Sequence, residues 1–173
     1  PVALMVIELP ELAELTTINA TGGFSAAESY AWHRLLLERS GAGYDPRVVQ
    51  RILRGATMKA HEYIDLMHAR RDWIARVETA LAPFDAVLSP TVPITAPSIS
   101  SVAPGAERDD EFFRVNTLLL RNPSIVNMLD GCAISLPCHV DGELPVGLML
   151  WHAALHDDAV LAVALQAERS LQK

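Results

Sequence analysis

Residues 85–97 read DAVLSPTVPITAP, an apolar run that leads into a series of prolines. The apolar run over residues 84–88 is bounded by Pro83 and Pro90, a pattern typical of a short strand inside a covered sheet. Proline lacks an amide hydrogen and biases the residue before it toward extended backbone, so an extended coil is expected from Pro90 to Gly105. One buried strand is therefore predicted near the middle of the chain.

Capping residues and apolar side chains three to four positions apart predict three helices before this strand. Asp45 and Pro46 supply the N-cap and the first residue of the second helix, and Gly55 is expected at its C-cap. The predicted helices are Ser25–Ser40, Arg47–Arg54 and Met58–Ala82.

Two further helices and two further strands are predicted after the proline-rich stretch. Asp141-Gly142 marks the turn that joins the two strands. Helices followed by a few buried strands and a last helix indicate an α/β protein with the sheet covered on both faces. The predicted elements are a helix over Asp109–Leu120, strands over Cys132–Cys138 and Pro145–Trp151, and a helix over Asp157–Gln172.

The composition is that of one globular domain, with 173 residues, 50% hydrophobic and 20% charged. A formal net charge of −7 argues against nucleic acid as a partner.

The uncharged stretch Ala86–Ala106 contains four prolines and could not satisfy its backbone hydrogen bonds in lipid, so no membrane segment is expected. Cys132 and Cys138, about 20 Å apart on an extended strand, are not expected to form a disulfide, which indicates a cytoplasmic protein.

Motifs for catalysis inside this chain are weak. Ser135, His139 and Asp141 lie close in sequence, but we interpret them as strand and turn residues rather than as a catalytic triad.

Lys59 is interpreted as a surface lysine, because it begins an amphipathic helix. His61 and His68 share a helix face but lie about 10 Å apart by helical rise. No metal site is therefore predicted, and no cofactor is expected, since the glycine-rich turns that bind phosphates are missing from the sequence.

Several sequence strings, taken together and in order, resemble the C-terminal portion of the amidase signature family. The resemblance extends over about Ala26–Gln172 and implies the C-terminal part of an α/β/α fold, with helices packed on a mixed sheet that has few strands in this chain. The strings are Tyr44-Asp45-Pro46-Arg47-Val48 with Arg51 and Gly55, the Asp85–Pro97 segment with its Pro90-Thr91 pair, and the series Asn127, Ser135, Pro137 and Leu144–Leu148.

This resemblance implies an enzyme that hydrolyses the C–N bond of a small carboxamide through an acyl-serine intermediate. Members of the family use a Ser–cis-Ser–Lys triad in the half of the domain that precedes the matched region, and no counterpart of that triad is recognisable here. Residues 1–173 are therefore expected to be a C-terminal fragment of a single amidase domain, with no catalytic residue in this chain and no activity alone. The residues expected to line the substrate pocket are Arg51, Arg121 and Asn127.

Other interpretations remain open at this stage. The chain could belong to the family's representative in a tRNA-dependent amidotransferase, which works with partner subunits. It could instead be a non-catalytic interaction module that presents Pro90-x-x-Pro93 as a polyproline II ligand. Exposed apolar surface is also expected where the rest of the domain would pack, so a homo-oligomer is possible.

Overall fold

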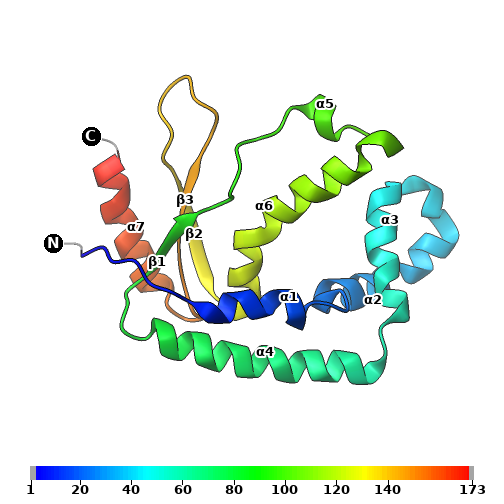
Figure 1. The fold of residues 1–173 in the computed structure, drawn as a ribbon, viewed down its shortest axis with the longest axis horizontal. Coiled ribbons are helices and arrows are strands. Elements are labelled where there is room, and N and C mark those ends of the chain that lie inside the picture. Colours follow the sequence, from blue (N-terminus) through cyan, green and yellow to red (C-terminus); the bar gives the residue numbers. More distant parts are fainter. Residues whose placement is uncertain (1–2, 172–173) are drawn as a thin grey trace. The chain divides into compact units, whose positions relative to one another are not determined.

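The sheet has three strands, β1 (Val87–Pro90), β2 (Cys132–Pro137) and β3 (Gly147–His152), in the order β1-β3-β2 (Figure 1). The structure, a computed structural model, describes residues 3–171. Both strand pairs are antiparallel, and Met149 of β3 lies opposite Ser89 on one side and Ser135 on the other. The α/β class and the small number of strands are confirmed. The described strands do not form the mixed sheet that we expected, because β2 and β3 are joined by a hairpin and β1 runs opposite to β3.

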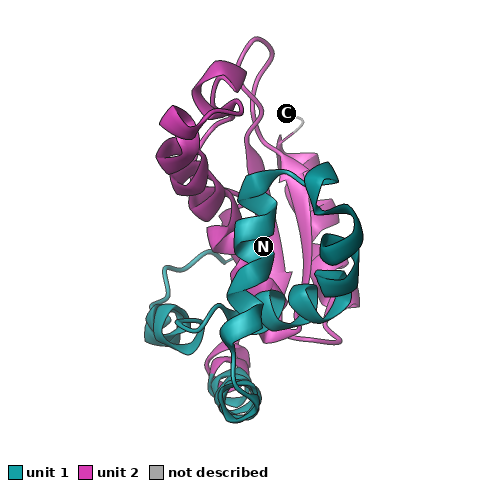
Figure 2. Cartoon of the chain, turned by 90° about the vertical axis from the view of Figure 1, so that its right-hand side faces the viewer, with its two compact units in different colours: residues 1–76 teal, residues 77–173 magenta. Residues whose placement is uncertain are grey.

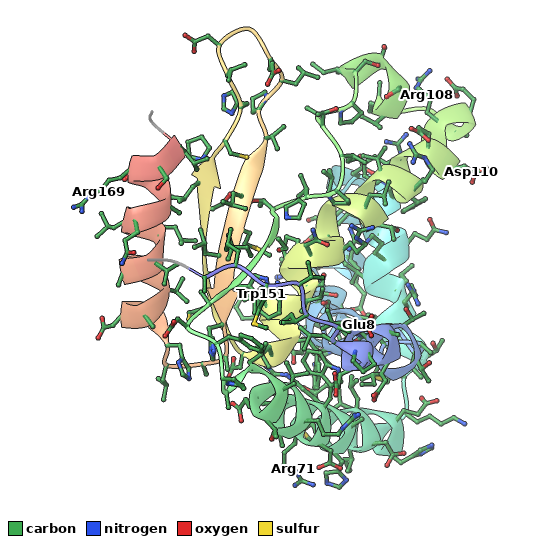
Figure 3. The ribbon with its side chains drawn as sticks, turned by 60° about the vertical axis from the view of Figure 1, so that its left-hand side comes forward. Glu8, Arg71, Arg108, Asp110, Trp151 and Arg169 are labelled. Atoms are coloured by element: carbon green, nitrogen blue, oxygen red, sulfur yellow. The ribbon has the colours of Figure 1, made fainter. Side chains whose placement is uncertain are left out.

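Helix α7 (Asp157–Leu171) covers one face of the sheet (Figure 1). Leu150 at the centre of β3 is completely buried there against Val160 and Ala164 of the helix. Side chains alternate along a strand, so the odd-numbered residues of β3 lie on the opposite face. Figure 3 shows the Trp151 side chain on that opposite face, directed away from α7. The two faces therefore differ in chemistry, with a leucine-rich core on one and polar side chains on part of the other.

Helix α6 spans Asp109–Leu129, nine residues beyond its expected end at Leu120. Pro123 lies inside the helix, although proline removes one backbone hydrogen bond and usually ends a helix. Val126 and Leu129 are buried, so tertiary packing of the last turns outweighs the local cost of Pro123. Asp130, at a φ of 61°, then ends the helix. This longer helix carries Asn127 as well as Arg121.

The chain divides into two compact units, residues 1–76 and 77–173, and the boundary falls within α4 (Ala60–Leu81) (Figure 2). In the first unit, Trp73 of α4 donates from Nε1 to the Glu11 carbonyl at 2.7 Å. Arg76 forms a double ion pair with Glu14, with both N···O distances at 2.6 Å. These bonds hold η1 (Pro10–Glu14) on α4. The elements are η1 (Pro10–Glu14), α1 (Leu15–Ile18), α2 (Gly23–Ser40), η2 (Gly41–Gly43), α3 (Pro46–Leu53), η3 (Arg54–Thr57) and α4 (Ala60–Leu81).

Several local predictions are confirmed and others are corrected. Asp45 caps α3 by accepting from the Arg47 amide at 2.8 Å, as expected. Gly55 is not a C-cap but lies in η3, where the chain continues as a 3₁₀ helix. The expected coil from Pro90 to Gly105 contains one short helix, α5 (Ile99–Val102), and the 3₁₀ helix η4 (Ala106–Arg108) follows directly after the coil. Strand β1 begins three residues later than predicted, because its pairing with β3 selects Val87–Pro90.

Within residues 3–171, no helix combines the length and the hydropathy needed to cross a bilayer. Cys132 and Cys138 are both free cysteines in the structure. The expected end of the last helix, Gln172, lies outside the described residues.

Candidate functional site

A glycine in the central strand lets two hydroxyl groups from the outer strands meet. Thr91 follows β1 and Ser135 lies on β2, and their hydroxyl oxygens are 2.5 Å apart. A Cβ on Gly147 of β3 would lie 2.5 Å from the Thr91 oxygen and 2.6 Å from the Ser135 oxygen, so only glycine leaves room for this contact. The Thr91 amide also donates to the Gly147 carbonyl at 2.8 Å. The hydroxyl pair is exposed at the edge of the sheet face opposite α7.

Helix α6 adds an amide and a guanidinium to this pair. Asn122 is buried, at 8% exposure, and its Nδ2 donates to the Pro90 carbonyl at 2.7 Å. Its Oδ1 accepts from Nε of Arg121 at 3.1 Å. Pro90 is covalently followed by Thr91, so one continuous set of contacts connects α6, the end of β1 and the strand β2. We call this set the polar network: Arg121, Asn122, Thr91 and Ser135, with Gly147 beneath the two hydroxyls.

The polar network can donate and accept hydrogen bonds but has no group that would activate a nucleophile. A serine needs an adjacent base before it can attack a carbonyl. The Ser135 hydroxyl is hydrogen-bonded to the Thr91 hydroxyl, whereas Nδ1 of His139 accepts from the Val146 amide at 3.4 Å. The residues that the structure describes therefore do not assemble Ser135, His139 and Asp141 into a triad.

The three predicted pocket residues occupy different places. Arg121 belongs to the polar network. Asn127 is exposed in the last turn of α6, six residues further along, and Arg51 is exposed on α3 in the first unit. Sequence reasoning missed Thr91 and Asn122 as site residues, although Thr91 lies in the Asp85–Pro97 segment and Asn122 directly follows Arg121.

The weaker motifs do not form sites in the described residues. No group of three or more His, Cys, Asp or Glu side chains within residues 3–171 is arranged to hold a metal ion. Lys59 is exposed before α4, where its backbone amide donates to the Glu62 carboxylate at 2.7 Å. Pro90 lies in β1 opposite Leu148, so the first proline of Pro90-x-x-Pro93 is part of the sheet rather than of a free polyproline II segment.

His152 is a buried titratable residue at the opposite end of β3 from Gly147. Only 2% of it is exposed, and its Nε2 lies 3.1 Å from the Phe84 carbonyl. Burial lowers the pKa of His152 below its ordinary value, and the nearby His156 ring, 3.9 Å away between centroids, lowers that pKa further. Hydrogen bonds to the Phe84 and Leu81 carbonyls and the charge of Asp85 oppose this shift only in part. His152 is therefore neutral in the fold near neutral pH.

The lowered pKa of His152 predicts acid sensitivity of the fold. Below a pH of about 6.5 the unfolded chain protonates this histidine while the folded chain does not, so stability falls as pH decreases toward the folded pKa. The slope from this one group is at most about 1.4 kcal/mol per pH unit. Urea unfolding of the wild type, His152→Gln and His139→Gln across pH 5–8 measures it. The His152 variant should lose part of the pH dependence, and the variant at the exposed His139 should keep it. An unchanged slope in His152→Gln would contradict this assignment.

Comparison with known proteins identifies the class. The family description "Amidase" matches residues 3–161 of this chain. This match covers most of the sequence, so the chain belongs to the amidase family. The resemblance drawn from the sequence strings is thereby confirmed.

Particular relatives fall within this class. The chain is 31% identical over 154 residues to a glutamyl-tRNA(Gln) amidotransferase subunit of Synechococcus sp. (strain CC9311), a match that covers 86% of this chain and 30% of that protein. It is 25% identical over 161 residues to a 2-amino-5-chloromuconic acid deaminase of Comamonas testosteroni, covering 92% of this chain and 34% of the relative. Among solved structures, an allophanate hydrolase of Kluyveromyces lactis matches with a TM-score of 0.77 and 25% identity, over 91% of this chain and 25% of that one. The chain thus spans about a third or less of the length of these relatives.

Proposed function

We propose that the protein containing this chain hydrolyses the C–N bond of a small carboxamide through an acyl-serine intermediate. Membership of the amidase family supports hydrolysis of such bonds. The observation that carries the proposal in this chain is the exposed polar network, in which Arg121 and two hydroxyls are fixed by α6 and the sheet. Groups of this kind orient a polar substrate without taking part in bond breaking.

We propose further that this chain is the C-terminal portion of the amidase domain and contributes binding groups rather than the nucleophile. Three features support this division. Ser135 is hydrogen-bonded to the hydroxyl of Thr91 and not to a base. Lysine occurs only at Lys59 and Lys173 in the sequence, and Lys59 is an exposed residue preceding α4. The relatives named above are about three times as long as the matched segment or longer.

Arg51, Arg121 and Asn127 are the residues that we propose to line the substrate pocket. The support is strongest for Arg121, because Asn122 orients its guanidinium. Arg51 follows the Asp45–Pro46 cap on α3, and Asn127 lies near the end of α6. A small-molecule amide is the expected partner of these side chains.

A second candidate is the corresponding component of a tRNA-dependent amidotransferase. Several relatives are named as subunits of a glutamyl-tRNA(Gln) amidotransferase, one of them 31% identical to this chain. Such a component would release ammonia from an amide donor and act with partner chains. Dependence of ammonia release on added partner subunits would favour this candidate over an amidase that acts alone.

We also propose that the protein can self-associate and that it is cytoplasmic. Large apolar side chains are exposed, including Val6 at 98% and Trp32 at 77%, and surfaces of this kind favour association. The two free thiols fit a reducing compartment.

Ammonia release tests the proposed function. The 173-residue chain and the full-length enzyme are incubated with a panel of small carboxamides, and ammonia is measured. We expect release by the full-length enzyme and none above background by the chain. Ser135→Ala is the matched variant: because Ser135 is assigned to binding and not to attack on the amide, the full-length enzyme should keep measurable ammonia release, and any loss should appear mainly in KM. Turnover by the chain that disappears in Ser135→Ala would contradict the proposal.

A further inference from the structure

The guanidinium of Arg121 is held at one nitrogen and available at the others. Its Nε donates to Asn122, and the described part of the chain records no further bond from this side chain. Arg121 is exposed on α6. Its two terminal nitrogens, Nη1 and Nη2, are therefore available to a ligand.

Asn122 makes this arginine more than a freely moving surface cation. Asn122 is itself buried and is bonded to the Pro90 carbonyl at 2.7 Å. An arginine whose Nε is fixed in this way has lost part of its rotational freedom before a ligand arrives, which reduces the entropy that binding would cost. Arginine also presents a planar pair of donors that matches a carboxylate with two parallel bonds.

The charge of Arg121 is not neutralised within the described chain. The acidic residues of α6 are in its first turn, Asp109 to Glu111, about 15 Å from Arg121 by helical rise. Glu111 is already paired with Arg114, at 2.7 Å. The chain as a whole is acidic, with a net charge of −7, yet no described carboxylate bonds with this guanidinium.

The hydroxyl pair supplies a complementary hydrogen-bonding group. Thr91 and Ser135 share one hydrogen between their oxygens, 2.5 Å apart, so one hydroxyl hydrogen remains for a ligand. Thr91 directly follows Pro90, whose carbonyl accepts from Asn122. The hydroxyl donor therefore lies in the same part of the second unit as Arg121.

We propose that Arg121, oriented by Asn122, binds a carboxylate of the substrate, and that the Thr91–Ser135 pair hydrogen-bonds the same molecule. The substrate class is then an amide that also carries a carboxylate. This inference rests on the proposed amidase function and specifies its substrate. Arg121 is a specificity-determining residue in this account, and Asn122 is a positioning residue.

A matched pair of substrates tests this inference. Succinamate carries an amide and a carboxylate, and butyramide has the same carbon chain without the charge. For the full-length enzyme, Arg121→Gln should lower kcat/KM for succinamate at least about tenfold, mainly through KM, because a charged hydrogen-bonding partner is lost. The value for butyramide should stay within about twofold. Arg121→Lys should fall between, since lysine keeps the charge but not the paired donors.

Arg114→Gln is the control for charge alone. Arg114 lies on the same helix and its change removes the same charge, but it is paired with Glu111 and lies outside the polar network. It should leave both substrates unaffected. Equal losses for succinamate and butyramide in Arg121→Gln, or no loss for either, would overturn the inference.

A binding measurement keeps this inference separate from the proposed function. Succinate is titrated into the isotopically labelled full-length enzyme, and two-dimensional amide NMR spectra are recorded. Succinate should shift the amide signals of Thr91, Asn122 and Ser135 in the wild type and in Arg114→Gln, but not in Arg121→Gln. If no amide is hydrolysed while these shifts occur, the amidase proposal fails and carboxylate binding stands. If succinate shifts none of these signals, or shifts them equally in Arg121→Gln, carboxylate binding at Arg121 is overturned.

Discussion

Gly55→Ala is expected to lower the free energy of unfolding by about 3 kcal/mol, a large fraction of the stability of a domain of this size. A Cβ at position 55 would lie 1.9 Å from the carbonyl oxygen of Ala26 and 2.8 Å from the Cβ of Tyr30. The obstacle is the backbone of α2, and Ala26 is buried, so no flexible side chain can move aside. Helix α2 and the 3₁₀ helix η3 must therefore separate.

Gly41→Ala is the matched control for this substitution. Gly41 lies in the 3₁₀ helix η2 with a φ of −56°, and no atom is within 4 Å of a Cβ placed there. Alanine at that position should be neutral or stabilise by up to about 1 kcal/mol, because it restricts the unfolded chain. Urea unfolding of the wild type and both variants gives the comparison. Equal stability of the two variants would contradict the close approach of α2 and η3.

Local sequence patterns predicted the parts of the fold that depend on local chemistry. The Asp45 cap needs only the amide of Arg47, two residues away, so it could be read from the sequence. The passage of α6 through Pro123 could not, because Val126 and Leu129 are buried by tertiary packing, which local patterns do not register. Strand β1 was misplaced for the same reason, since its ends are set by pairing with β3.

The candidate site was predicted only in part. Arg121 was identified through the family resemblance and lies in the polar network. Thr91 and Ser135 are 44 residues apart and meet because the register of three strands places both over Gly147. A shift of one residue in that register would turn either side chain to the other face, and the local patterns predicted the strands without predicting how they pair. Asn122 was missed because its partner, the Pro90 carbonyl, is 32 residues away.

The central claim is that this chain binds the amide substrate while the serine that attacks it lies elsewhere in the enzyme. A serine nucleophile with an activating base reacts covalently with a fluorophosphonate, whereas a serine hydrogen-bonded only to another hydroxyl does not. The contrast is one of modification or no modification, so the expected effect is all-or-none. Among the serines of this chain, Ser135 is the one to examine for modification, because it is exposed and lies in the polar network.

Peptide mapping of the full-length enzyme after reaction with a fluorophosphonate measures this directly. We predict one modified serine, outside residues 1–173, whose modification abolishes amide hydrolysis. The 173-residue chain treated in the same way should remain unmodified. An adduct on Ser135, or on any other serine of this chain, that accompanies the loss of activity would contradict the account.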